Sequence, residues 1–123
     1  MTEIESINLS KLLLDRENPR LSEFGITTKS KEAEILQILW DEMAVNELMY
    51  SIVSNGFWDY EPLIVMKTAD GNSYVAIEGN RRLAAVKLIH DQTEIKVPKH
   101  IIDKIDSALI NQTTKLPCIV VNS

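Results

Sequence analysis

Apolar residues recur at intervals of three and four along four stretches of this chain, and this spacing is typical of helices that bury one face. Ser30 is placed to cap the first stretch, Asn55-Gly56 ends the second, and Pro98 suits the first turn of the last. The third stretch is apolar on more than one side, so we expect the rest of the fold to cover that helix. The four helices are expected over residues 30–43, 46–54, 81–90 and 98–110.

Four shorter apolar runs predict strands. The turn residues Asp70-Gly71-Asn72 separate the second run from the third, so these two strands should form a hairpin. Strands and helices together predict an α/β (α+β) fold, with a small mixed sheet flanked by helices. The four strands are expected over residues 4–9, 63–66, 74–77 and 116–121.

The length of 123 residues and a hydrophobic content of 45% predict a single domain spanning residues 1–123. The one cysteine, Cys118, excludes an internal disulfide and lies in an apolar run, so we expect it to be buried. No apolar run approaches the roughly 20 residues that cross a bilayer, and no leader is recognisable, so the expected location is cytoplasmic.

The most informative segment joins the third predicted strand to the third predicted helix, with the sequence Glu78-Gly79-Asn80-Arg81-Arg82. A helix N-terminus offers unpaired N–H groups and about half a positive charge, and two arginines add bidentate donors. Gly79 permits a positive φ, and Asn80 is a good N-cap residue. This segment therefore predicts a phosphate site.

Charge favours a compact phosphate ligand over a nucleic-acid duplex. The chain has 13 basic and 18 acidic residues, for a net charge of −5, which opposes a broad basic surface. A third arginine, Arg20, follows Asn18-Pro19 and is expected to emerge from a bend rather than a helix. Phe57 and Trp58 are expected either to cap the core or to line the ligand pocket.

Four motifs occur in an order that resembles the ParB N-terminal domain of the ParB/sulfiredoxin superfamily. Asn80 stands where ParB proteins have glutamate and sulfiredoxins have cysteine, and residues 22–45 and 91–113 look like helical insertions relative to a short ParB domain. In ParB proteins further segments usually follow this domain, so the chain is expected to be the N-terminal part of a longer protein. The motifs are Glu17-Asn18-Pro19-Arg20, residues 51–57 with 61–65, the segment 78–85 (Glu78-Gly79-Asn80-Arg81-Arg82-Leu83-Ala84-Ala85), and Leu116-Pro117-Cys118-Ile119-Val120-Val121.

The resemblance implies a nucleotide-binding domain, with CTP or another nucleoside triphosphate and Mg²⁺ as ligands, in a DNA-associated protein. It implies that Glu78 or Asn80 gives an oxygen to the phosphate-bound Mg²⁺. DNA would be contacted through additional segments or partners, and a homodimer is expected from the same resemblance. The residues implied to hold the phosphates are Arg20, Gly79, Asn80, Arg81 and Arg82.

Two other classes of function remain open from the sequence. The first is an enzyme that uses the same phosphate site, as a ParB-like nuclease, a small-molecule kinase or a slow NTPase, with Glu78, Glu61 or Glu17 as the catalytic carboxylate. Sulfiredoxin activity is disfavoured because the amide of Asn80 cannot replace a thiolate. The second is a non-catalytic protein-interaction domain.

Overall fold

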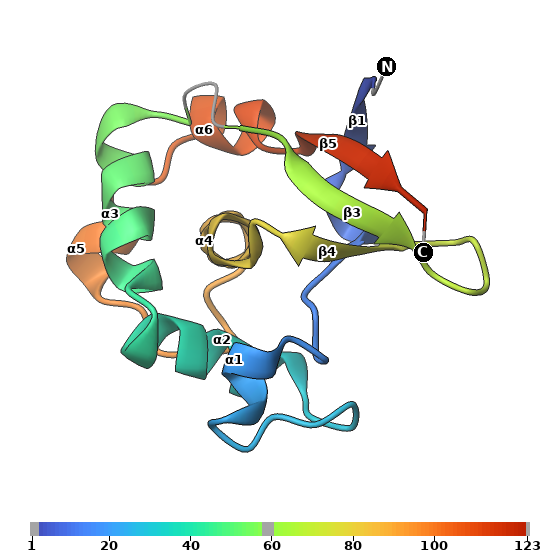
Figure 1. Ribbon diagram of the computed structural model, residues 1–123. Coiled ribbons are helices and arrows are strands. Elements are labelled where there is room, and N and C mark those ends of the chain that lie inside the picture. Colours follow the sequence, from blue (N-terminus) through green and yellow to red (C-terminus); the bar gives the residue numbers. More distant parts are fainter. Residues whose placement is uncertain (1–2, 58–60, 123) are drawn as a thin grey trace.

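The computed structural model describes residues 3–57 and 61–122, which form one curled sheet and a group of helices (Figure 1). The strands are β1 (Ile4–Asn8), β2 (Leu12–Leu13), β3 (Leu63–Lys67), β4 (Tyr74–Glu78) and β5 (Lys115–Val121). The helices are α1 (Pro19–Ser22), α2 (Glu32–Glu42), α3 (Val45–Asn55), α4 (Asn80–His90), α5 (Lys99–Ile102) and α6 (Ser107–Gln112), with a 3₁₀ turn, η1, at Leu9–Lys11.

The sheet is mixed, as its sequence predicts, with the strand order β1-β5-β3-β4-β2. The predicted hairpin is the antiparallel pair β3 and β4, whereas β5 runs parallel to β3 and antiparallel to β1. At the other edge, β2 pairs with β4 in parallel over only two residues. A two-residue strand has no recognisable periodicity, which is why the sequence did not predict β2.

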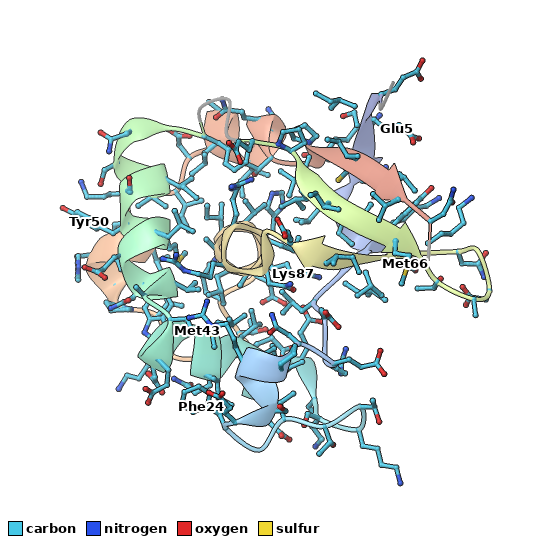
Figure 2. The ribbon with its side chains drawn as sticks, viewed as in Figure 1. Glu5, Phe24, Met43, Tyr50, Met66 and Lys87 are labelled. Atoms are coloured by element: carbon cyan, nitrogen blue, oxygen red, sulfur yellow. The ribbon has the colours of Figure 1, made fainter. Side chains whose placement is uncertain are left out.

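Helix α4 lies at the centre of the molecule, between α3 on one side and β4 and β3 on the other (Figure 1). It is covered on several sides, as its sequence predicts, and its small residues Ala84 and Ala85 are fully buried. Lys87 ties α4 to α2 through an ion pair with Glu32 at 3.2 Å (Figure 2). The remaining buried apolar residues of α4 are Leu83, Val86, Leu88 and Ile89.

Three local expectations from the sequence are wrong. Arg20 lies inside the short helix α1, because Asn18 caps that helix and Pro19 occupies its first turn. Ser30 does not cap α2, since its hydroxyl accepts a hydrogen bond from the Thr27 N–H and α2 begins two residues later. Asn80 is not the N-cap of α4, because Gly79 is the N-cap and Asn80 is the first helical residue.

The single helix expected over residues 98–110 is also wrong, because the segment forms two short helices, α5 and α6. Helix α5 ends at Ile102, and Asp106 then caps α6 in an extended conformation, with its side chain accepting a hydrogen bond from the Leu109 N–H at 2.8 Å. Aspartate competes in this way with helical hydrogen bonding, so it begins a new helix instead of continuing the old one.

Cys118 is fully buried in β5, as the sequence predicts. Burial, with a smaller contribution from the Glu5 carboxylate, raises the pKa of its thiol to about 11. The thiol is therefore protonated and unreactive at neutral pH. Within residues 3–57 and 61–122, no helix is long and apolar enough to cross a membrane.

Candidate functional site

The site is built on the turn that joins β4 to α4. Gly79 adopts a φ of +96°, which L side chains rarely adopt. A Cβ added there would also collide with the Leu63 side chain of the neighbouring strand β3. The backbone conformation therefore favours glycine, and a side chain here would also have to displace the terminal methyl group of Leu63.

The N-terminus of α4 faces out of this turn. The Leu83 N–H donates to the Gly79 carbonyl at 2.9 Å, so the N–H groups of Asn80, Arg81 and Arg82 precede the helical hydrogen-bond ladder. Their direction and the macrodipole of this eleven-residue helix favour an anion. The strand, glycine turn and helix that the sequence predicts at this position are therefore present, and the anion site remains a prediction.

A pocket of about 380 Å³ opens beside this helix end, and we call it the arginine pocket. Its polar wall consists of the turn, the start of α4 and the segment around α1. Its apolar wall comes from α2, α3 and β4, and includes Met43 at the junction of α2 and α3 (Figure 2). The lining residues are Asn18, Arg20, Leu39, Met43, Leu48, Ile77, Glu78, Gly79, Asn80, Arg81 and Arg82.

Arg20 reaches this pocket from a distant part of the sequence. Its helix α1 begins at Pro19, and the Arg20 N–H donates to the Asn18 side chain at 3.0 Å. The Arg20 and Arg81 side chains are exposed, and neither has a hydrogen bond or ion pair within residues 3–57 and 61–122. Two cations are thus placed at one pocket, and neither forms an ion pair with an acidic side chain in the described part of the chain.

Arg82 differs from the other two arginines because it is partly buried and bonded to the protein. Its guanidinium donates to the backbone carbonyl of Glu61, in the segment that leads into β3. Arg82 therefore supports that segment while it lines the pocket.

Asn80 also has a structural attachment, although its position at the pocket agrees with the sequence prediction. Its side chain is only 7% exposed, and its amide donates to the Ala76 carbonyl at 2.8 Å. Its side-chain oxygen accepts a hydrogen bond from the Asp15 N–H at 2.9 Å. The amide group thus links the end of β4 to the segment that follows β2.

The structure separates the three candidate carboxylates. Glu78 lines the arginine pocket and is exposed. Glu17 lies instead beside a smaller cavity of about 200 Å³, and Glu61 does not line the arginine pocket. Glu78 is therefore the predicted carboxylate that the fold brings to the Gly79 turn.

A metal bound here would depend on ligand phosphates. The part of the chain that the structure describes holds no group of three His, Cys, Asp or Glu side chains arranged for a metal ion. Glu78 offers one exposed carboxylate at the pocket, which suits Mg²⁺ because this ion commonly binds one or two carboxylates together with substrate phosphates.

Phe57 is buried at the end of α3 and exchanges hydrogen bonds with Gln112 of α6 through both of its backbone groups, at 3.1 and 2.6 Å. It does not line the arginine pocket, so its observed role is in the core. Trp58 lies outside the described residues.

Sequence reasoning missed the apolar wall of the pocket. Leu39 and Met43 were assigned to the core by their helical spacing, and both are indeed buried. Helical periodicity identifies an apolar face but not which part of that face borders a ligand pocket. The contact of Asp15 with Asn80 was missed as well, since it is made by the backbone N–H of Asp15 and not by its side chain.

The comparison with protein families shows to which family the chain belongs. The family model described as "ParB N-terminal domain" matches residues 26–113, so the chain belongs to the ParB N-terminal domain family. The matched range includes the turn at Gly79 and the start of α4. No curated protein matched the chain.

A solved structure of a ParB protein shares the fold. A C-terminally truncated chromosome-partitioning protein ParB from Caulobacter crescentus, complexed with CTP-gamma-S, has a TM-score of 0.51 and 15% identity. The match covers 98% of this chain and 45% of that ParB chain, so this chain spans less than half of its length. Sulfiredoxin from Arabidopsis thaliana has a TM-score of 0.43 and 18% identity, over 98% of this chain and 86% of the sulfiredoxin chain.

Proposed function

We propose that this ParB N-terminal domain binds a nucleoside triphosphate in the arginine pocket, with CTP and Mg²⁺ as the first candidates. The observation that carries the proposal is the meeting of Arg20 with the Gly79 turn and Arg81 in one pocket. Oriented N–H groups, a helix dipole and guanidinium groups all favour the same kind of ligand, an anion with several oxygens. A triphosphate fits this combination because it has enough oxygens to contact both segments.

The two exposed arginines have the clearest roles in this proposal. Arg20 and Arg81 have no acceptor within the described part of the chain, so a phosphate would add hydrogen bonds without breaking internal ones. The N–H groups at the start of α4 would bind the phosphate between them. Arg82 would hold the segment before β3 in place and add charge to the pocket.

Mg²⁺ would neutralise part of the charge of the triphosphate and would be held mainly by its oxygens. Glu78 is the protein carboxylate best placed to contribute. The side-chain oxygen of Asn80 was also predicted as a contributor, but its hydrogen bond to Asp15 makes Glu78 the better candidate.

The choice of CTP rests on family membership and on the ParB structure named above, which was crystallised with a CTP analogue. The same family membership supports a role in a DNA-associated protein. DNA would be contacted by additional segments or partners, because the net charge of −5 disfavours direct duplex binding by this domain. Family membership also supports a homodimer.

Isothermal titration calorimetry of the chain with CTP, ATP and GTP, each with and without Mg²⁺, tests the proposal. Saturable binding of one nucleotide that is lost in Arg81→Ala would support it. Lys96→Ala is the matched control, since it removes an exposed cation outside the pocket. No binding of any of the three nucleotides would contradict the proposal and favour a protein-interaction domain.

Glu78 gives one reason to test catalysis at the same site, as a slow NTPase, a nuclease or a small-molecule kinase. A carboxylate in a phosphate pocket can serve as a general base. Chromatography of the nucleotide after incubation separates binding from turnover. Products that form with the wild-type chain but not with Glu78→Gln would assign the reaction to this carboxylate.

A further inference from the structure

The segment that carries Arg20 has few attachments to the sheet. After the two-residue pairing of β2 with β4, the chain leaves the sheet, and five residues separate the end of β2 from the start of α1. An arginine on so short a helix can bind a phosphate with precision only if its segment is fixed relative to the Gly79 turn. The structure must therefore contain a tie between the two.

Asn80 provides this tie. Burying an amide is costly unless its donor and acceptor are both satisfied, and both groups of Asn80 are bonded within the protein. One bond goes to Ala76, four residues earlier on β4. The other goes to Asp15, which is 65 residues away in sequence.

A series of local hydrogen bonds connects Asp15 to Arg20. The Asn18 N–H donates to the Asp15 carbonyl at 3.3 Å, and the Asp15 side chain accepts from the Glu17 N–H at 3.0 Å. The Asn18 side chain then caps α1 by accepting from the Arg20 N–H. These bonds connect the backbone of Asp15 to α1, so Asp15 helps to position Arg20, together with the neighbouring Leu21, which is fully buried in the core.

We infer that Asn80 is a positioning residue, whose buried side chain holds Arg20 at the correct distance from the first turn of α4. This inference rests on the proposed function and deepens it. The side chain of Asn80 acts through Arg20 and does not itself bind the ligand. Asparagine suits the position because it offers a donor to Ala76 and an acceptor to Asp15 at the same time.

A double-mutant cycle on nucleotide affinity tests this coupling. In the wild-type chain, Arg20→Ala should weaken binding by about tenfold to a hundredfold, as expected for the loss of a charge-assisted contact. In an Asn80→Ala background, α1 keeps its packing through Leu21 but loses the connection to Asn80, so Arg20 is held less precisely and the same change should cost less than about threefold. Arg81→Ala should keep most of its effect in both backgrounds, because Arg81 lies on α4 itself.

Hydrogen exchange at the Asp15 amide tests the tie without any ligand. Asn80→Ala removes both bonds and should increase the exchange rate of this amide at least tenfold relative to neighbouring amides. Asn80→Asp keeps an acceptor for the Asp15 N–H but loses the donor to Ala76, so the Asp15 amide should stay protected. Both variants lose the hydrogen bond to the Ala76 carbonyl, so the difference between their exchange rates at the Asp15 amide reports the bond from Asp15 to residue 80.

Thr113→Val controls for a general loss of stability. Thr113 is the other buried polar residue among those described, and its hydroxyl donates to the Leu109 carbonyl away from the arginine pocket. This variant should be less stable but should keep the full effect of Arg20→Ala. Thermal melts of every variant confirm folding at the temperature of the titrations.

The outcomes are distinguishable. An Arg20→Ala effect of equal size in the wild-type and Asn80→Ala backgrounds would overturn the inference and leave the proposed function standing. Unchanged protection of the Asp15 amide in Asn80→Ala would overturn it as well. A wild-type chain that binds none of the three nucleotides would overturn the proposed function and this inference with it.

Discussion

The guanidinium of Arg82 donates a hydrogen bond to the backbone carbonyl of Glu61, two residues before β3 begins. The bond connects the first turn of α4 to the segment that enters the central strand of the sheet. The two adjacent arginines of α4 therefore have different surroundings, although the sequence presents them as a pair.

This difference predicts different phenotypes for the two arginines. Arg81→Ala should weaken nucleotide binding by about tenfold to a hundredfold and leave the free energy of unfolding unchanged, because Arg81 is exposed. Arg82→Ala should weaken binding and also lower the free energy of unfolding by about 1 kcal/mol, as for a typical lost hydrogen bond. Calorimetry and urea denaturation measure the two effects. Equal stability of the two variants would contradict the role given to Arg82.

Gly79→Ala should destabilise the fold by about 2 kcal/mol or more, because the change combines a disfavoured φ with a collision against Leu63. Gly71→Ala is the matched control. Gly71 also has a positive φ, of +75°, but a Cβ there would meet nothing within 4 Å. Urea denaturation of both variants separates backbone strain from the collision, and an equal loss in the two would show that Leu63 moves aside easily.

Cys118 predicts a pH dependence of stability in the alkaline range. Burial raises the pKa of this thiol from about 9.0 to about 11, so the folded state keeps the proton at pH values where the unfolded chain loses it. Cys118 thus contributes stability that is fully present below pH 9 and is lost as the pH rises toward 11. The free energy of unfolding should fall more steeply over this range in the wild-type chain than in Cys118→Ala. Parallel slopes would contradict this prediction.

Cys118→Ser should leave ligand affinity unchanged and cost only stability, because it places a hydroxyl in a fully buried position of β5. A sulfinic-acid reductase assay of the wild-type chain should show no activity. Reductase activity that disappears in the variant would reverse the structural role assigned to this thiol.

The isolated chain should show no sequence-specific binding to duplex DNA at physiological salt. Its net charge is −5, and only a few arginines are positioned to neutralise phosphates. Weak binding, where present, should disappear as salt rises. Gel-shift titrations against random and candidate-site duplexes check this expectation, and tight, salt-resistant binding to one sequence would contradict it.

Long periodic segments were predictable from the sequence, and so was the turn at Gly79. The helices α2, α3 and α4 follow from apolar spacing, and the hairpin of β3 and β4 follows from the turn between them. The predicted mixed sheet is confirmed by the strand order, and the predicted ParB-like fold is confirmed by the family match. These features depend on local pattern, which a single sequence records.

The features that were not predictable depend on single side chains or on distant contacts. Helix α5 ends at Ile102, and Asp106 begins α6 through its own side chain; apolar spacing does not register such a break. The two-residue strand β2 exists only because β4 is beside it. Asn80 appeared from the sequence to be a cap and phosphate ligand, and its bond to Asp15 becomes visible only when the two segments are brought together.

The order of strands in the sheet has a consequence for how the chain folds. The sole partner of β1 within the described sheet is β5, the strand that comes last in the sequence. While the protein is being synthesised, β1 has no strand to pair with until residues 115–121 have left the ribosome. An unpaired strand edge is prone to aggregation during this interval, and the charged residues Glu3 and Glu5 on either side of Ile4 oppose it.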